Sequence, residues 1–191
     1  FQDFFGISIA LSGNTAVVGA PGSSMGPNTD GAAYVFERVG TVWSQQAKLT
    51  ASDGAVDDDF GYSVAIDGDT AIVGSIFDDD EGSQTGSAYV YFRSGAVWTQ
   101  QAKLLADDAT SNDRFGESVA ILGDTAMVGA TLDDENMLFT SGSVYVFDRS
   151  GTVWTQTDKL NPADASENAR FGRSIALDGD TAVIGAVDDA P

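Results

Sequence analysis

The sequence predicts an all-β protein made of repeated four-stranded antiparallel sheets. A Phe-Gly pair recurs at regular steps along the whole chain, and short runs between these pairs alternate apolar and polar residues. Glycine is abundant, with 22 residues, and proline is rare, with 4, which is typical of many short strands joined by tight turns. No amphipathic helix of useful length is visible, so helices are not expected.

Three landmarks with constant spacing define the repeat. The Phe-Gly pairs begin at Phe5, Phe60, Phe115 and Phe171, so the steps are 55, 55 and 56 residues. A Gly-Ala or Gly-Ser pair follows 14 residues after each Phe, and a third glycine opens a Tyr-containing segment at Gly31, Gly86 and Gly142. We therefore expect one repetitive domain over residues 1–191, with units at about 5–59, 60–114, 115–170 and 171–191.

Each unit is expected to contain four strands. In the second unit they lie at about Ser63–Ile66, Thr70–Gly74, Ala88–Arg93 and Val97–Leu104. An Asp-Gly-Asp turn joins the first two strands and a Ser-Gly turn joins the last two, as in tight hairpins. Alternation in the last strand predicts that one face carries Trp98, Gln100, Ala102 and Leu104.

Such a sheet, apolar on both faces, is not stable alone, so the units are expected to stack face to face. Radial stacking gives a β-propeller, whereas a solenoid of sheets, the rival arrangement, usually has shorter repeats. Trp43, Trp98 and Trp154 recur three residues after a turn glycine, which favours packing between sheets over sugar binding. The expected architecture is a β-propeller fragment with three full four-stranded blades and half of a fourth.

The recurring motifs resemble the FG-GAP repeat along the whole chain. They are Phe-Gly, Ser-Val-Ala-Ile (63–66), Gly-Ala-Pro (19–21) and Gly-Ser-Ala-Tyr-Val (86–90). The resemblance implies blades like those of integrin α-subunit heads, usually seven to a ring, in bacterial surface or secreted proteins. It also implies that Phe-Gly and Gly-Ala-Pro segments pack against each other between blades. The residues with this structural role are Phe5, Gly6, Gly19, Phe60, Gly61, Gly74, Phe115, Gly116, Gly129, Phe171, Gly172 and Gly185.

One connection departs from the integrin pattern, in which a calcium loop of the Asp-x-Asp-x-Asp-Gly kind joins the first two strands. In this chain the connection is reduced to Ser12-Gly13-Asn14, Asp67-Gly68-Asp69, Leu122-Gly123-Asp124 and Asp178-Gly179-Asp180. A turn of this length cannot wrap the roughly 6–8 oxygens that calcium prefers. The calcium site of the family is therefore not expected at these turns.

The loop after each Gly-Ala or Gly-Ser pair holds candidate metal ligands. Carboxylates crowd together there, and their hard oxygens suit calcium or magnesium, of which calcium is the expected cofactor. The candidate ligands are Asp78, Asp79, Asp80, Asp133, Asp134 and Glu135. The alternative is that these side chains are solvated loop tips and Asx turns, and the first unit has Ser23 and Ser24 instead.

A second acidic position recurs seven residues before a Phe-Gly pair. It is occupied by Asp53, Asp108 and Asp164. An Asp at a fixed loop position usually accepts hydrogen bonds from nearby backbone N–H groups. We expect that role here, with a metal or ligand role as the alternative.

The composition excludes several functions. The net charge is −20, from 29 acidic and 9 basic residues, and it repels nucleic acid and anionic membrane surfaces. The chain has no cysteine and no histidine, so it lacks disulfides, thiol chemistry and the commonest general base. No apolar stretch approaches the ~20 residues that a membrane helix needs, so membrane insertion is not expected.

We therefore expect a non-catalytic recognition or adhesion module, extracellular or on the cell surface, whose partner is a protein or a glycan. Enzymatic activity is not expected, because catalytic residues in a propeller are normally unique and these carboxylates mostly repeat. The alternatives are a carbohydrate-active enzyme module, such as a lyase or a sialidase-like hydrolase, and a lectin. Open blade ends would expose apolar faces and strand edges, so we expect a longer natural chain or self-association.

Overall fold

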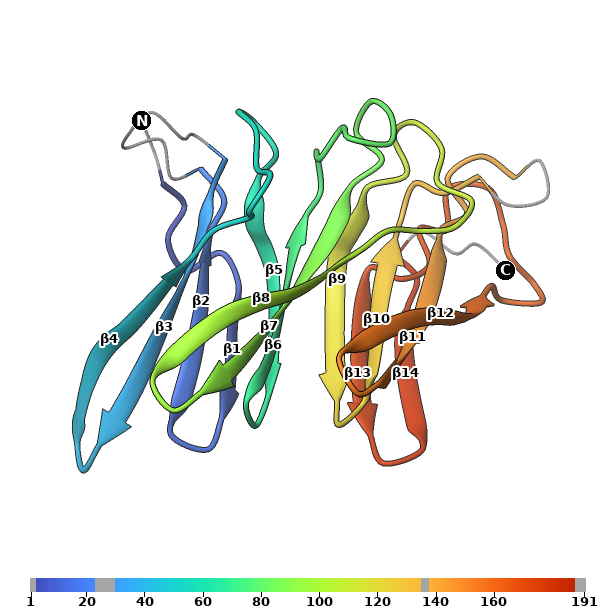
Figure 1. Cartoon of the computed structure of the whole chain (residues 1–191). Coiled ribbons are helices and arrows are strands. Elements are labelled where there is room, and N and C mark those ends of the chain that lie inside the picture. The colour runs from blue at the N-terminus through green and yellow to red at the C-terminus, as the bar shows by residue number, and fades with distance from the viewer. Residues whose placement is uncertain (1–2, 23–29, 135–137, 188–191) are drawn as a thin grey trace.

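The computed structural model describes residues 3–22, 30–134 and 138–187, and all regular elements in them are strands. The strands form four antiparallel sheets that stand side by side (Figure 1), three of four strands and one of two. The predicted all-β fold of four-stranded antiparallel blades is confirmed. No helix in the described part of the chain has the length and apolar character needed to cross a membrane.

We number the sheets as blades in chain order. Blade 1 contains β1 (Ile9–Ser12), β2 (Thr15–Ala20), β3 (Ala32–Val39) and β4 (Val42–Leu49). Blade 2 contains β5 (Phe60–Asp67), β6 (Thr70–Ser75), β7 (Ser87–Ser94) and β8 (Val97–Leu104). Blade 3 contains β9 (Phe115–Leu122), β10 (Thr125–Ala130), β11 (Ser143–Ser150) and β12 (Val153–Leu160). Blade 4 contains β13 (Ser174–Asp178) and β14 (Thr181–Gly185).

The first strands of the blades form one continuous surface, which we call the inner wall. Strand β1 contacts β5, β5 contacts β9, and β9 contacts β13. Strands β4, β8 and β12 lie at the other edge of their sheets, and β8 and β12 cross the front of the view in Figure 1. Each blade therefore runs in chain order from the inner wall to an outer edge strand.

Strand β5 begins three residues earlier than the sequence pattern predicts. Phe60 pairs with Ser75 and Ser63 pairs with Gly74, so two residues of β5 bulge out between these pairs. One of them is Gly61, whose φ of +97° is a conformation that favours glycine. The Phe-Gly motif thus opens the strand with a bulge.

Neighbouring blades meet at the backbones of two glycines. At the junction of blades 2 and 3, the carbonyl oxygen of Gly116 lies 2.0 Å from the point where a Cβ on Gly74 would stand, so no side chain fits there. The Ser63 hydroxyl donates to the same carbonyl at 2.7 Å. The other two junctions repeat these roles with Ser8, Gly19 and Gly61 and with Ser118, Gly129 and Gly172. Gly185 holds the equivalent position in blade 4.

The phenylalanine of the Phe-Gly pair packs between its own blade and the preceding one. Phe60 is fully buried in a cluster that joins blades 1 and 2, edge-on to Tyr89 with 5.4 Å between ring centroids. Phe115 takes the same position between blades 2 and 3. Phe171 is half-buried. No described blade precedes blade 1, and there Phe5 is 57% exposed and a Cβ on Gly6 would meet open space.

Each full blade has a β-bulge in its outer strand that the alternating sequence pattern concealed. In blade 2 the register shifts after Val90, which leaves Gln101 without a partner across the ladder. An extra residue of this kind shifts the alternation by one position. Trp98 therefore packs against the core between blades 1 and 2, whereas Ala102 and Leu104 pack in the core between blades 2 and 3. The expectation that these side chains share one face is wrong.

The tryptophans connect outer strands of neighbouring blades. The indole N–H of Trp98 donates to the side-chain oxygen of Gln46 in blade 1 at 2.7 Å, and that of Trp154 donates to Gln101 in blade 2 at 2.8 Å. Both rings also pack against the core between the blades. Trp43, on the face of blade 1 that no described blade covers, is 42% exposed.

The close contact between glycines predicts that one added methyl group lowers the stability of the fold. Gly74→Ala places a Cβ against the Gly116 carbonyl, so blades 2 and 3 must separate. We expect the free energy of unfolding to fall by about 3 kcal/mol, measured by urea denaturation. The control is Gly95→Ala in an exposed turn with open space around it, where only the positive φ is strained and the loss should be about 1 kcal/mol. Equal losses would contradict the contact.

Candidate functional site

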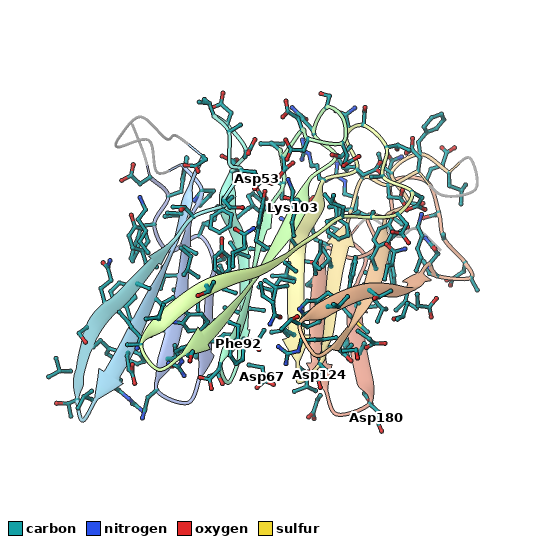
Figure 2. The ribbon with its side chains drawn as sticks, in the orientation of Figure 1. Asp53, Asp67, Phe92, Lys103, Asp124 and Asp180 are labelled. Atoms are coloured by element: carbon teal, nitrogen blue, oxygen red, sulfur yellow. The ribbon has the colours of Figure 1, made fainter. Side chains whose placement is uncertain are left out.

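The two ends of the blades differ in chemistry. Figure 2 shows Asp53 and Lys103 at one end, which we call the loop end, and Asp67, Asp124 and Asp180 at the other, the turn end. At the turn end, the carboxylates of Asp69 and Asp124 pair with arginines of their own blades. The loop end holds the acidic candidates and is the more complex of the two.

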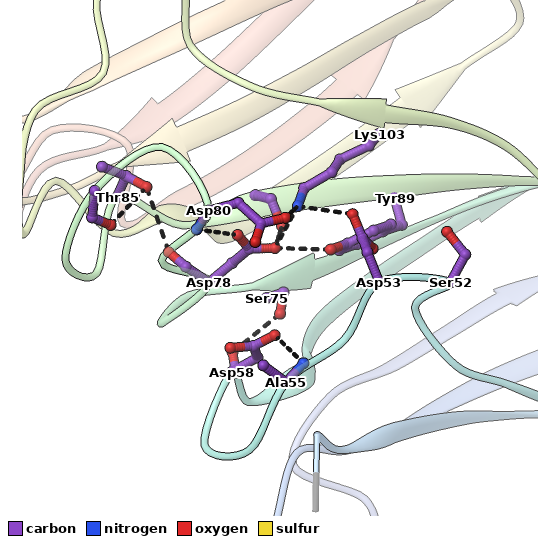
Figure 3. A network of polar contacts seen from close by, with 12 residues as sticks. Ser52, Asp53, Ala55, Asp58, Ser75, Asp78, Asp80, Thr85, Tyr89 and Lys103 are labelled. Carbon is purple, nitrogen blue, oxygen red and sulfur yellow. Dashed lines mark hydrogen bonds and ion pairs between the residues drawn. The ribbon is translucent and has the colours of Figure 1, made fainter. Parts of the chain in front are cut away.

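A buried network of hydrogen bonds and ion pairs surrounds Asp78 at the loop end (Figure 3). The Asp78 side chain is 2% exposed and accepts hydrogen bonds from the hydroxyls of Ser87 and Tyr89, both at 2.7 Å. The Lys103 ammonium lies 2.9 Å from Asp78 and 2.6 Å from Asp80. Burial alone would raise the pKa of Asp78, but the hydrogen bonds from Lys103, Tyr89 and Ser87 outweigh it and hold the pKa below its usual value.

Lys103 also connects blade 2 to the segment that precedes it. Its ammonium group lies 3.1 Å from Asp53, which follows the last strand of blade 1. Blade 3 repeats this ion pair between Lys159 and Asp108, at 2.7 Å. Asp53 therefore pairs with the lysine of the next unit. Asp108 does the same and also accepts the expected kind of hydrogen bond from a nearby backbone N–H, its own. Asp164 is exposed.

Two more carboxylates, five residues further along, also accept hydrogen bonds from the backbone. Asp58 accepts from the N–H of Ala55 at 2.7 Å, and Asp113 accepts from the N–H of Thr110 at 2.6 Å. Each lies two residues before a Phe-Gly pair. The sequence analysis did not predict this second position, which carries an Asp in both units.

Blade 3 repeats the network around Asp133. This side chain is 3% exposed, accepts from the Ser143 hydroxyl, and lies 2.9 Å from the Lys159 ammonium. Asp134 is exposed and accepts from the N–H of Thr140 at 2.7 Å. Glu135 lies outside the described residues.

The candidate metal ligands therefore fall into two groups, one buried and one exposed. Asp78 and Asp133 turn inward to lysines, whereas Asp79, Asp80 and Asp134 are exposed. Among the residues that the structure describes, no group of three or more acidic side chains is placed to hold a metal ion. The cation beside the buried carboxylates is an ammonium group of the chain itself, and calcium at these loops stays a prediction.

Asp58 has an unusual environment next to this network. Its side chain is buried, and burial is the main cause that raises the pKa of its carboxyl to about 6. The hydrogen bond from Ala55 opposes this rise, and the negative charges of Asp78, Asp79 and Asp80 add to it. A buried carboxyl of this kind changes charge near neutral pH.

A cavity of about 460 Å³ lies on the inner wall. Each blade contributes three consecutive lining residues, which lie near the start of its first strand, β1, β5, β9 or β13. The second residue after each Phe differs in every unit: Ile7, Tyr62, Glu117 and Arg173. The Glu117 carboxylate is buried, accepts from the hydroxyl of Thr131, and pairs with Arg173 of blade 4 at 3.3 Å. The sequence analysis did not predict this site. The signal for it in the sequence is the variation at the position just before a serine that all four units share.

The comparisons with known proteins agree with the repeat pattern. The family model described as FG-GAP repeat matches residues 1–36, 43–91, 98–147 and 154–191. No curated protein matches the chain. The four matched segments cover most of the sequence, and each of the last three begins in the outer strand of the preceding blade.

The ammonium of Lys103 should be essential to the stability of the loop end. Lys103→Met leaves Asp78 buried without a cation, and we expect the free energy of unfolding to fall by about 3 kcal/mol. Urea denaturation measures the loss, and adding Asp78→Asn to this variant should recover part of it. The control is Lys48→Met, because Lys48 is exposed and its described contact is the ring of Tyr34. A loss no larger than that of the control would contradict the network.

The raised pKa of Asp58 predicts a pH-dependent stability. The folded-state pKa, about 6, exceeds the usual 3.8, so the stabilisation from the protonated form is complete below about pH 4 and lost as the pH rises through 6. Asp58→Asn keeps the acceptor for Ala55 and does not titrate. We expect its unfolding free energy, relative to the unmodified chain, to improve between pH 4 and pH 7 by roughly 1–3 kcal/mol. A constant difference for Asp58→Asn over this pH range would refute the assignment.

Proposed function

The chain belongs to the FG-GAP repeat family, and on that premise we propose that it is a non-catalytic recognition or adhesion module of an extracellular or cell-surface protein. Its partner in this proposal is a protein or a glycan. Propeller blades of this family form integrin-like modules, and a rigid stack of sheets can present surface residues without rearrangement. Fold alone does not give function, so the proposal rests on a site.

The inner wall carries the proposal. Residues that repeat in every unit, such as Ser63 and Gly74, are used in contacts between blades. The position just before that serine carries an aliphatic, an aromatic, an acidic and a basic side chain in the four blades. The serine and the two glycines of the blade contacts are the same in every unit, whereas side chains that differ between units suit the recognition of an asymmetric ligand.

The residues of the inner wall support an enzymatic function less well than they support recognition. Glycoside hydrolysis generally requires two carboxyl groups on either side of the scissile bond. In the lining of this cavity the one carboxylate is Glu117, and it is already paired with Arg173. A lectin with equivalent sites in each blade pair is also less favoured, because the four blades contribute different side chains.

Binding to an immobilised array of glycans and extracellular-matrix proteins tests this function. We expect the unmodified chain to bind at least one member, and Tyr62→Ala to weaken that binding about tenfold, since it removes the aromatic ring from the inner wall. Asp180→Asn at the turn end is the matched control and should bind normally. If no member of the array is bound, or if a bound glycan is cleaved, the proposal fails.

A further inference from the structure

Phe92 occupies a position in β7 that other blades give to an acid. The equivalent residues are Glu37 in blade 1 and Asp148 in blade 3, at the same register positions. The Phe92 ring is 41% exposed. An exposed aromatic ring at a site where the repeat otherwise places a carboxylate is not required for packing between blades.

The substitution also leaves a hydrogen-bond donor without its usual acceptor. In blade 1, the amide nitrogen of Gln46 donates to Glu37, and in blade 3 the hydroxyl of Thr157 donates to Asp148 at 3.0 Å. Gln101 is the equivalent residue in blade 2, at the bulge of β8. Its oxygen accepts from Trp154, and within the described residues its amide nitrogen has no acceptor.

These residues border a cavity of about 340 Å³ between the outer strands of blade 2 and the outer hairpin of blade 3. The size lies within the range of small-molecule sites. No lining residue carries a charge: besides the ring of Phe92, the lining includes Ser94, Thr99, Gln100, Gln101 and Thr152, and the amide of Gln100 is already bonded to Ser52. In blade 1 the position of this ring is taken by the Glu37 carboxylate.

We propose that this groove binds an uncharged sugar unit of a glycan, with the ring of Phe92 against the C–H face of the sugar. A pyranose offers both an apolar face and oxygen acceptors, and so matches the exposed ring and the amide of Gln101. The net charge of −20 disfavours acidic glycans near an uncharged groove. The site lies on the outer edge of the blades, so it goes beyond the recognition proposed for the inner wall.

The test uses neutral oligosaccharides of glucose, mannose, galactose and N-acetylglucosamine, with sialylated and uronic-acid oligosaccharides for comparison. Array screening selects the probe, and calorimetric titration measures the affinity. We expect the unmodified chain to bind a neutral oligosaccharide and Phe92→Glu to bind it at least tenfold more weakly. Phe92→Glu introduces the residue that blade 1 carries at this position and gives Gln101 an acceptor, so the blade should remain folded, as its melting temperature checks.

Two further variants complete the experiment. Phe92→Trp keeps an aromatic face and should retain binding, and Phe139→Ala, which removes a ring 64% exposed in a loop of blade 3, should not affect it. The sugar site is overturned if no neutral oligosaccharide binds, or if Phe92→Glu binds as well as the unmodified chain. Binding of a protein or an acidic glycan that depends on Tyr62 would then leave the proposed recognition function intact, and an absence of all binding would refute both.

Discussion

The close approach of two glycine backbones at each junction is the contact on which the rest of this structure depends. The Gly116 carbonyl lies where a side chain on Gly74 would stand, and the Ser63 hydroxyl donates to it. This contact sets the distance between sheets, and the distance lets Phe115 fill the space between blades 2 and 3 completely. The outer contacts, such as that of Trp154 with Gln101, join the same two blades at their outer strands.

A buried negative charge at the loop end places a second constraint on the structure. A carboxylate as deeply buried as Asp78 needs a partner, because an isolated buried charge is very costly. The chain supplies Lys103, which neutralises Asp78 and at the same time reaches Asp53 before the blade. With few basic residues in the sequence, the placement of one lysine at this point in blade 2 and another in blade 3 is an efficient use of positive charge.

The sequence allowed much of the fold to be predicted, because the landmarks repeat at fixed spacing and the turns are short. The bulge at Gln101 could not be predicted, since the residues on either side of it satisfy a regular alternation. The ion pair of Lys103 with Asp53 joins residues 50 positions apart, and no local pattern indicates it. The inner-wall residues were not predicted for the opposite reason. Tyr62 and Glu117 occupy a position that differs between the units, and a repeat is defined by the positions that agree.

The junctions between blades have a consequence for how such chains evolve. Because each junction uses the same serine and the same two glycines, duplication or loss of one whole unit recreates a compatible junction on both sides. An insertion of part of a unit would bring unlike residues together and destroy the contact. Recombination is therefore free to change the length of the array in whole-unit steps, while point substitutions on the inner wall and at position 92 change what each blade presents.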